Sequence, residues 1–132
     1  MPLYMHCRDA FDDFYSIVKS SGYSNGVVHC FTGTKEQAKL LCELGFYLGI
    51  TGWIYDRKRN ENLIEAIKTI PLNKILVETD APWLSIDKSR QSHPLDTGDI
   101  VHEIARIKKI DEIKCGKQIY ANTKTLFKNL IV

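Results

Sequence analysis

Four short apolar runs recur along the 132-residue sequence, and each is followed by a segment whose apolar residues have helical spacing. The runs predict strands at Leu3–His6, Gly26–Phe31, Phe46–Ile50 and Lys74–Thr79. Near-continuous apolar strands are typical of parallel sheets buried on both faces, and helical crossovers between such strands are right-handed. The pattern therefore predicts an α/β fold, either a doubly wound sheet or a piece of a (β/α)₈ barrel. Length alone favours the doubly wound sheet, because a complete barrel needs about 250 residues.

Apolar residues at spacings of three and four predict the helices between and after these strands. We expect them over Asp9–Ser20, Thr34–Leu44, Asn60–Thr69, Asp96–Ile110 and 111–127. Thr34 is an expected N-cap, and Gly45 and Pro71 are expected to end two of the helices.

The composition indicates one folded domain over residues 1–132, since 44% of the residues are hydrophobic and 26% are charged. The apolar runs are too short to span a membrane, and the first ten residues lack the pattern of a signal peptide. We therefore expect a cytoplasmic protein with no membrane partner. Its four cysteines form no C-x-x-C pair, so we expect reduced thiols. A net charge of +2 permits contact with a polyanion without indicating it.

Polar side chains stand where the predicted strands end. His6 and His29 lie at the ends of the first two, and Asp80 follows the fourth. Because the carboxyl ends of parallel strands share one edge of the sheet, these groups should converge where α/β proteins build their sites. Two imidazoles and a carboxylate suit Zn²⁺, Mn²⁺ or Fe²⁺, and a carboxylate-rich site also accepts Mg²⁺. A divalent metal there would lower the pKa of a bound water and polarise a phosphoryl or acyl oxygen.

A purely structural role is the alternative for each of these residues. A histidine at a strand end is often only hydrogen-bonded and half-buried. For Glu78 we favour hydrogen bonds to a neighbouring loop, in support of the site, over direct metal ligation. Arg8 either forms an ion pair with Asp9 at a helix start, where Asp9 is the N-cap, or contacts the substrate.

The charged segment 56–59 has two interpretations. Such a loop is usually only solvated, but on the same side as the strand ends Lys58 and Arg59 would hold phosphates.

Several motifs together resemble the TatD family of metal-dependent deoxyribonucleases. They are YMHCRDA, GVVHCFTG, YLGITGW and ILVETDAPWL, in that order, with YANTKTLF at the end. The resemblance covers essentially the whole chain. It implies a (β/α)₈ barrel of the metal-dependent hydrolase type with a two-metal site at the C-terminal ends of its strands. On the family pattern His6 and His29 are metal ligands, and Asp80 both binds metal and orients or deprotonates the attacking water.

The resemblance also implies an activity. It predicts hydrolysis of phosphodiester bonds, typically by a 3′–5′ exonuclease on single-stranded DNA or RNA, with Mg²⁺, Zn²⁺ or Mn²⁺ as cofactor and a link to DNA repair.

The family pattern is present only in part. The first-strand His-x-His motif and the glutamate that bridges the metals have no counterpart, and 91–94 reads QSHP where the family often has RNEP. We therefore expect four βα units, the C-terminal half of the barrel, without its N-terminal half. A half-barrel exposes unpaired edges, which predicts self-association, pairing with a separately encoded N-terminal half, or marginal stability. The alternatives to a nuclease are a catalytically inactive remnant and a nucleic-acid-binding module that acts through Arg8, Lys58 and Arg59.

Overall fold

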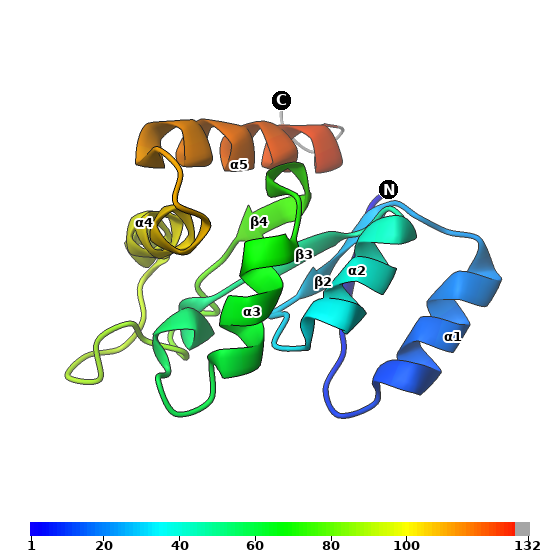
Figure 1. Cartoon of the computed structure of the whole chain (residues 1–132), viewed down its shortest axis with the longest axis horizontal. Coiled ribbons are helices and arrows are strands. Elements are labelled where there is room, and N and C mark those ends of the chain that lie inside the picture. The colour runs from blue at the N-terminus through cyan, green and yellow to red at the C-terminus, as the bar shows by residue number, and fades with distance from the viewer. Residues whose placement is uncertain (129–132) are drawn as a thin grey trace.

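The computed structural model describes residues 1–128 and contains a four-stranded parallel sheet (Figure 1). Its strands are β1 (Leu3–His6), β2 (Gly26–His29), β3 (Tyr47–Ile50) and β4 (Ile75–Val77). They stand in the sheet in chain order, and each pairs in parallel with the next. A doubly wound sheet reverses its strand order at a switch point. This sheet has no reversal, which excludes the doubly wound arrangement.

The predicted helices are confirmed, with small shifts at their ends. They are α1 (Phe11–Ser21), α2 (Lys35–Glu43), α3 (Glu61–Thr69), α4 (Thr97–Lys108) and α5 (Glu112–Leu126). Short 3₁₀ turns lie between them at η1 (Gly52–Tyr55), η2 (Leu72–Lys74) and η3 (Pro94–Asp96).

Two of the expected helix starts have different outcomes. Thr34 caps α2 as expected, because its hydroxyl accepts a hydrogen bond from Gln37 N–H while the Gln37 side chain accepts one from Thr34 N–H. The expectation that Asp9 caps α1 is wrong. Its φ of 55° turns the chain before the helix, and Ala10 occupies the cap position without a side-chain hydrogen bond.

One face of the sheet packs against helices and forms the main core. Alternate strand residues Val28, Leu48 and Ile75 point to that face and are almost completely buried. Figure 1 shows α2 and α3 in front of this face of the sheet. The helices contribute the apolar positions Val18, Ala38, Leu41, Leu63, Ala66, Ile67, Ile100, Ile104, Ile107, Cys115 and Ile119.

The opposite face of the sheet has a much smaller apolar cluster. Val27 and Leu76 pack there against Leu126 at the end of α5, with Tyr47 and Phe127 at its margin. Helix α5 runs across the end of the sheet where β4 begins (Figure 1), and Asn122 Nδ2–H donates to the carbonyls of Leu72 and Ile75 at 2.8 Å each. The carboxyl ends of the strands are therefore left to the loops.

The described helices include none that combines the length and the apolar character needed to cross a membrane.

Candidate active site at the carboxyl ends of the strands

Three residues with strained backbone angles lie just beyond the strand ends. Asp9, Cys30 and Asp80 follow β1, β2 and β4, and their φ angles are 55°, 46° and 56°. A residue other than glycine with positive φ is uncommon and costs about 1–3 kcal/mol. Such residues persist where the surrounding structure holds them, and they concentrate at functional sites. Backbone strain and polar side chains thus mark the same edge of the sheet.

His29 stands at the centre of this edge, held by two oxygens. Its Nδ1 lies 2.7 Å from the hydroxyl oxygen of Tyr4 and 2.9 Å from Glu78 Oε2, while the Tyr4 hydroxyl donates to the same carboxylate oxygen. Both oxygens serve as acceptors for Nδ1–H, so we assign the ring proton to Nδ1. Nε2 then carries the lone pair, and it lies 3.9 Å from Asp80 Oδ1.

Glu78 reaches across the sheet to make these contacts. Its backbone N–H donates to Ile50 O at 3.0 Å, which continues the pairing of β4 with β3 by one residue. Its Oε1 accepts a hydrogen bond of 2.7 Å from Cys30 N–H, two strands away. The side chain passes over Gly49, where an added Cβ would overlap Glu78 Oε1. The glycine therefore makes room for the carboxylate.

The donors present fit a divalent metal chemically but do not complete a site. Nε2 of His29 and the Asp80 carboxylate are both electron-pair donors, and at 3.9 Å one ion with bonds of about 2.0–2.2 Å can contact both. The imidazole of His6 lies beside them, with its ring centroid 5.6 Å from that of His29. Within residues 1–128, however, no three His, Cys, Asp or Glu residues are gathered as a metal site requires. The structure thus brings together a pair of donors and a neighbouring histidine.

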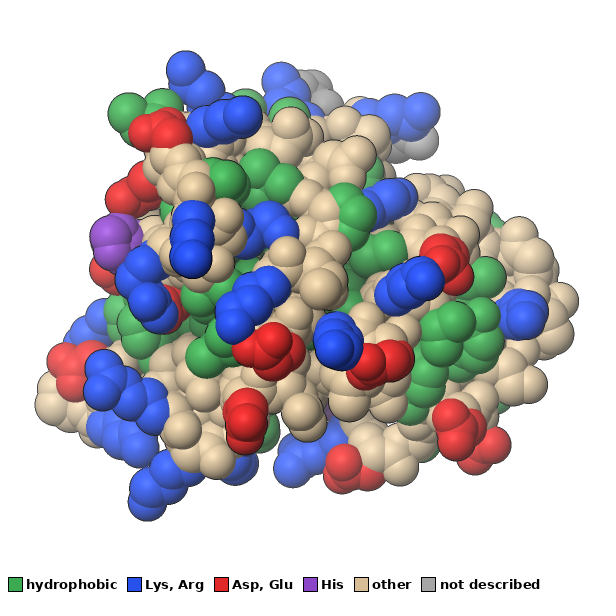
Figure 2. Space-filling model, viewed as in Figure 1, with side chains coloured by type: hydrophobic (Ala, Val, Ile, Leu, Met, Phe, Trp, Pro, Cys, Tyr) green, Lys and Arg blue, Asp and Glu red, His purple; other side chains and the backbone are tan. Residues whose placement is uncertain are grey.

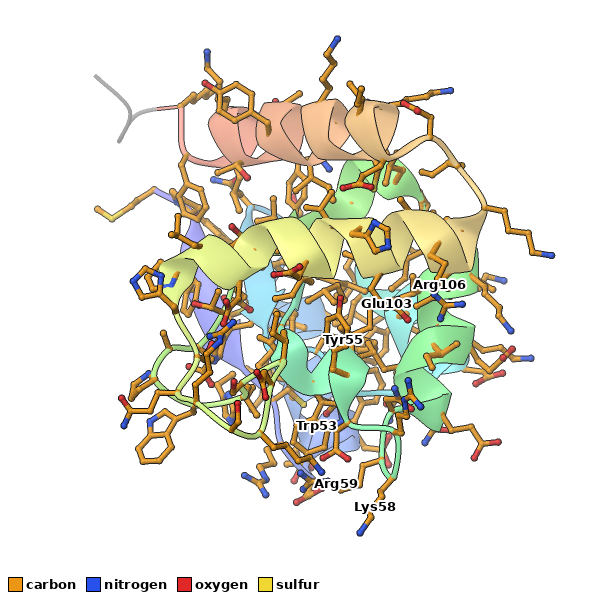
Figure 3. The ribbon with its side chains drawn as sticks, turned by 90° about the vertical axis from the view of Figure 1, so that its left-hand side faces the viewer. Trp53, Tyr55, Lys58, Arg59, Glu103 and Arg106 are labelled. Atoms are coloured by element: carbon orange, nitrogen blue, oxygen red, sulfur yellow. The ribbon has the colours of Figure 1, made fainter. Side chains whose placement is uncertain are left out.

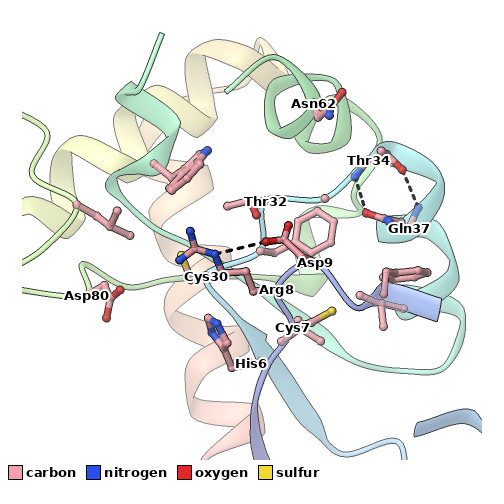
Figure 4. Close-up of a pocket in the computed structure, with 17 residues that line it drawn as sticks. His6, Cys7, Arg8, Asp9, Cys30, Thr32, Thr34, Gln37, Asn62 and Asp80 are labelled. Carbon is pink, nitrogen blue, oxygen red and sulfur yellow. Dashed lines mark hydrogen bonds and ion pairs between the residues drawn. The ribbon is translucent and has the colours of Figure 1, made fainter. Parts of the chain in front are cut away.

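A pocket of about 530 Å³ opens at the same edge (Figure 4). His6, Arg8 and Asp80 line it, whereas His29 and Glu78 are not among its lining residues. The Arg8 Nε lies 3.8 Å from Asp9 Oδ2, and both side chains are highly exposed. Such an exposed pair contributes little to stability, so the Arg8 guanidinium remains available to a ligand in the pocket.

The other predicted phosphate contacts lie outside the pocket lining. Figure 3 shows Lys58 and Arg59 on the loop that follows η1, next to Trp53. The Arg59 guanidinium stacks 4.2 Å from the centroid of the Trp53 ring and pairs with Asp56 Oδ2 at 2.6 Å. Trp53 itself lines the pocket. The basic loop therefore adjoins the pocket through this indole.

Three residues of the site escaped the sequence interpretation: Tyr4, Cys30 and Gly49. Tyr4 lies two residues before His6, and strand alternation alone places both on one face. Burial and the hydrogen bond to Glu78 raise the pKa of Tyr4 above its ordinary value, so its hydroxyl keeps its proton. Burial also raises the pKa of the Cys30 thiol, which keeps this group neutral. The contact between Glu78 and Gly49 joins two strands and leaves no signal in the local sequence.

Comparison with known proteins assigns the family. The family model described as "TatD related DNase" matches residues 1–128. The chain belongs to the TatD-related DNase family.

Curated members of the TatD family share more than a third of the aligned residues. The 3′-5′ ssDNA/RNA exonucleases TatD of Shigella flexneri and of Escherichia coli are each 38% identical to this chain, over 96% of it. The match covers 52% of each exonuclease, so the chain spans about half the length of the curated relatives it matches.

Solved structures of TatD proteins have the same fold as this chain. A TatD homologue of Escherichia coli superposes with a TM-score of 0.89 at 25% identity, over 97% of this chain and 50% of the homologue. A TatD-family hydrolase of Entamoeba histolytica gives a TM-score of 0.85 at 25% identity, over 96% of this chain and 50% of the hydrolase. The parallel four-stranded sheet and its helices therefore match half of a TatD fold.

Proposed function

We propose that this chain carries part of the active site of a metal-dependent nuclease that hydrolyses phosphodiester bonds in single-stranded DNA or RNA. Two matched curated relatives bear the name 3′-5′ ssDNA/RNA exonuclease TatD. The observation that carries the proposal is the orientation of His29. Its Nδ1 faces the Tyr4 hydroxyl and Glu78, and its Nε2 faces Asp80 at 3.9 Å.

Each residue has a distinct part in this proposal. His6, His29 and Asp80 hold a divalent metal, Mg²⁺, Zn²⁺ or Mn²⁺. When bound, that metal supplies a Lewis acid and a lowered pKa for a coordinated water. Asp80 lines the pocket with its carboxylate partly exposed, so it can orient a water and accept its proton. Glu78 does not ligate the metal but holds His29 in the tautomer that presents Nε2.

Basic side chains supply the proposed contacts to substrate phosphates. Arg8 lines the pocket together with Asp80, so in this proposal it contacts the phosphate at the reacting bond. Lys58 and Arg59 lie on the adjoining loop, where they contact phosphates farther along the strand.

The architecture proposed for the domain is the C-terminal half of a (β/α)₈ barrel over residues 1–132. Support comes from the consecutive strand order and from β1, whose outer edge pairs with no strand among residues 1–128. Leu3 and Tyr4 on β1 are 44% and 62% exposed. Pairing of β1 with another strand, from an N-terminal half or a second copy, would cover this edge and bring the missing donors to the site. A cytoplasmic location and a link to DNA repair belong to the same proposal.

The test is metal-dependent degradation of a single-stranded oligonucleotide. Asp80→Asn keeps the size of the side chain and removes its charge, so the rate should fall by at least about 100-fold. Asp13→Asn, on an exposed carboxylate of α1 outside the pocket lining, is the matched control and should retain the rate. Equal rates of oligonucleotide degradation by the unsubstituted chain and by Asp80→Asn would overturn the proposal.

One observation favours the second candidate, a chain that binds nucleic acid without cleaving it. Within residues 1–128 no complete metal-binding group is present. In that case oligonucleotide binding would be salt-sensitive and indifferent to chelator, and no divalent metal would support cleavage.

A further inference from the structure

A second hollow, of about 630 Å³, adjoins the pocket at the strand ends. It is formed by the loop that follows Asp80, and Leu84 lines both the hollow and the pocket. The residues around it are Pro82, Trp83, Leu84, Ser85, Lys88, Ser89, Arg90 and Gln91. The hollow therefore adjoins the pocket at Leu84, on the loop that begins at Asp80.

Trp83 is the most conspicuous side chain of the hollow. It is 71% exposed, although an indole carries more apolar surface than most side chains. Its backbone N–H donates to Asp80 O at 2.9 Å, which fixes the main chain that carries the indole, three residues beyond the proposed catalytic carboxylate. Beside the polar site, this exposed ring offers a flat apolar surface on which a planar ligand can stack.

The loop that carries Trp83 is held in shape by its own hydrogen bonds. Ser92 N–H donates to Pro82 O at 3.1 Å and closes the loop. Ser89 N–H donates to the Asp87 carboxylate at 2.9 Å. Contacts of this kind preorganise a platform and lower the entropic cost of binding.

The charges around the hollow favour an anionic ligand. The Arg90 guanidinium is bound to both oxygens of Asp96, at 3.0 and 2.7 Å, so its charge is already matched. The Asp87 carboxylate faces the backbone of its own loop. Lys88 is exposed, and it is the cation that the hollow offers to a ligand.

Lys88 also belongs to a larger basic surface. Figure 2 shows Lys and Arg side chains gathered at the lower left, over the loops that follow β3 and β4. The pKa of Asp56 is lowered by its hydrogen bond from Arg59 and, more weakly, by the charge of Lys88, so Lys88 acts on the loop that carries Lys58 and Arg59. A phosphate chain that leaves the pocket therefore meets positive charge along this rim.

We propose that the hollow formed by loop 82–91 is a nucleotide subsite, in which one base of a single-stranded nucleic acid stacks on Trp83 and an adjacent phosphate lies against Lys88. An exposed aromatic ring beside a cation is the combination that binds single strands, because an unpaired base offers its flat face. The ligand class rests on the proposed function, whereas the position and chemistry of the subsite follow from the loop itself.

The sequence contains two tryptophans, which gives the proposal a direct readout. In Trp53→Phe the tryptophan emission, excited selectively over that of the six tyrosines, comes from Trp83 alone. With chelator present to prevent cleavage, a short oligodeoxyadenylate should quench this fluorescence, since a stacked base quenches indole emission. An abasic strand of the same length, with the same phosphates, should bind more weakly and leave the emission unchanged.

Two substitutions test the subsite by affinity. Trp83→Ala should weaken oligodeoxyadenylate binding by about 5- to 150-fold, whereas Trp83→Phe should retain much of it. Lys88→Gln should weaken binding of both strands alike and reduce the slope of log affinity against log salt by about 0.7. Both positions are exposed, so circular dichroism should show an unchanged fold.

The outcomes separate this proposal from the proposed function. Equal quenching by the abasic strand, or no quenching up to millimolar strand, would overturn the subsite. A change in oligomeric state in Trp83→Ala, with binding intact, would also overturn it and assign the indole to a protein interface. Quenching without metal-dependent cleavage would leave the subsite standing while the nuclease proposal fails.

Discussion

The two faces of the sheet are built from the same strands but from different chemistry. Toward the helices the strands present apolar side chains that are almost fully buried, such as Leu48 and Ile75. Toward the opposite face point the alternate residues, among them Tyr4, His29 and Glu78, whose side chains are joined by hydrogen bonds. The period of two in a strand thus separates the residues that hold the fold from those that build the candidate site.

The difference shows how sensitive each face is to substitution. The helix-facing side depends on volume and burial, so it tolerates exchange between apolar residues of similar volume but not truncation. The polar side depends on the placement of individual atoms, since Glu78 alone contacts three groups on two other strands. Stability and function should therefore respond to different substitutions.

The largest effect is expected on the helix-facing side. Leu48 is completely buried in the core, and Leu48→Ala should lower the free energy of unfolding by about 2–5 kcal/mol through lost burial and a residual cavity. Urea denaturation measures this change. Leu3→Ala is the matched control, because Leu3 is 44% exposed and its truncation should cost less than about 1 kcal/mol. Equal losses in the two variants would contradict the placement of Leu48 in the buried core.

On the polar face, Gly49→Ala should cost less stability than Leu48→Ala but should strongly weaken metal binding. In Gly49→Ala the new methyl group would overlap Glu78 Oε1 and displace the carboxylate from Cys30 N–H and His29. The backbone donor left without a partner should cost about 1–3 kcal/mol. Loss of the group that supports His29 should weaken metal binding by about 10- to 100-fold.

Gly98→Ala is the control for this substitution. No atom lies within 4 Å of a Cβ added at Gly98, which is in α4, so the change should leave metal binding intact and stabilise the fold by about 0.5–1 kcal/mol. Metal titration by calorimetry compares the two variants. Unchanged metal affinity in Gly49→Ala would show that the Glu78 contacts do not matter to the site.

Much of the fold was predictable because its signals are local. Apolar runs and helical spacing gave the element order, and Thr34 as an expected N-cap marked the start of α2. No local sequence signal distinguishes a doubly wound sheet from a barrel-type sheet. The distinction depends on strand order, which the resemblance indicated and the structure gives as consecutive.

The candidate site was predictable only at the level of residue types. That His6, His29 and Asp80 meet at one edge follows from parallel strands. That Glu78 crosses over Gly49 to reach Cys30 could not be predicted, because it depends on the register of three strands. The same holds for Asp9, whose positive φ replaced the expected helix cap.

A finer test of the polar face concerns the proton on His29. In Glu78→Gln the amide oxygen can still accept from Cys30 N–H, while the amide NH₂ donates to His29 Nδ1 and drives the ring proton to Nε2. Stability should change by less than about 1.5 kcal/mol. Nitrogen NMR chemical shifts of the His29 imidazole should report a proton on Nδ1 in the unsubstituted chain and a proton on Nε2 in Glu78→Gln. The same tautomer in both proteins would remove the assigned role of Glu78.

The smallest effect is expected from a carboxylate that serves only the fold. Hydrogen bonds from Arg90 and from His93 N–H lower the pKa of Asp96 from 3.8 to about 2. Because the folded pKa lies below the unfolded one, the stabilisation is fully present above about pH 4 and is lost as the pH falls toward 2. Asp96→Asn should remove this part of the acid dependence, and Arg90→Ala should shift acid unfolding to higher pH. Circular dichroism between pH 5 and about pH 2 measures acid unfolding of both variants and of the unsubstituted chain. If the three unfolding curves coincide, the Arg90–Asp96 pair does not stabilise the loop.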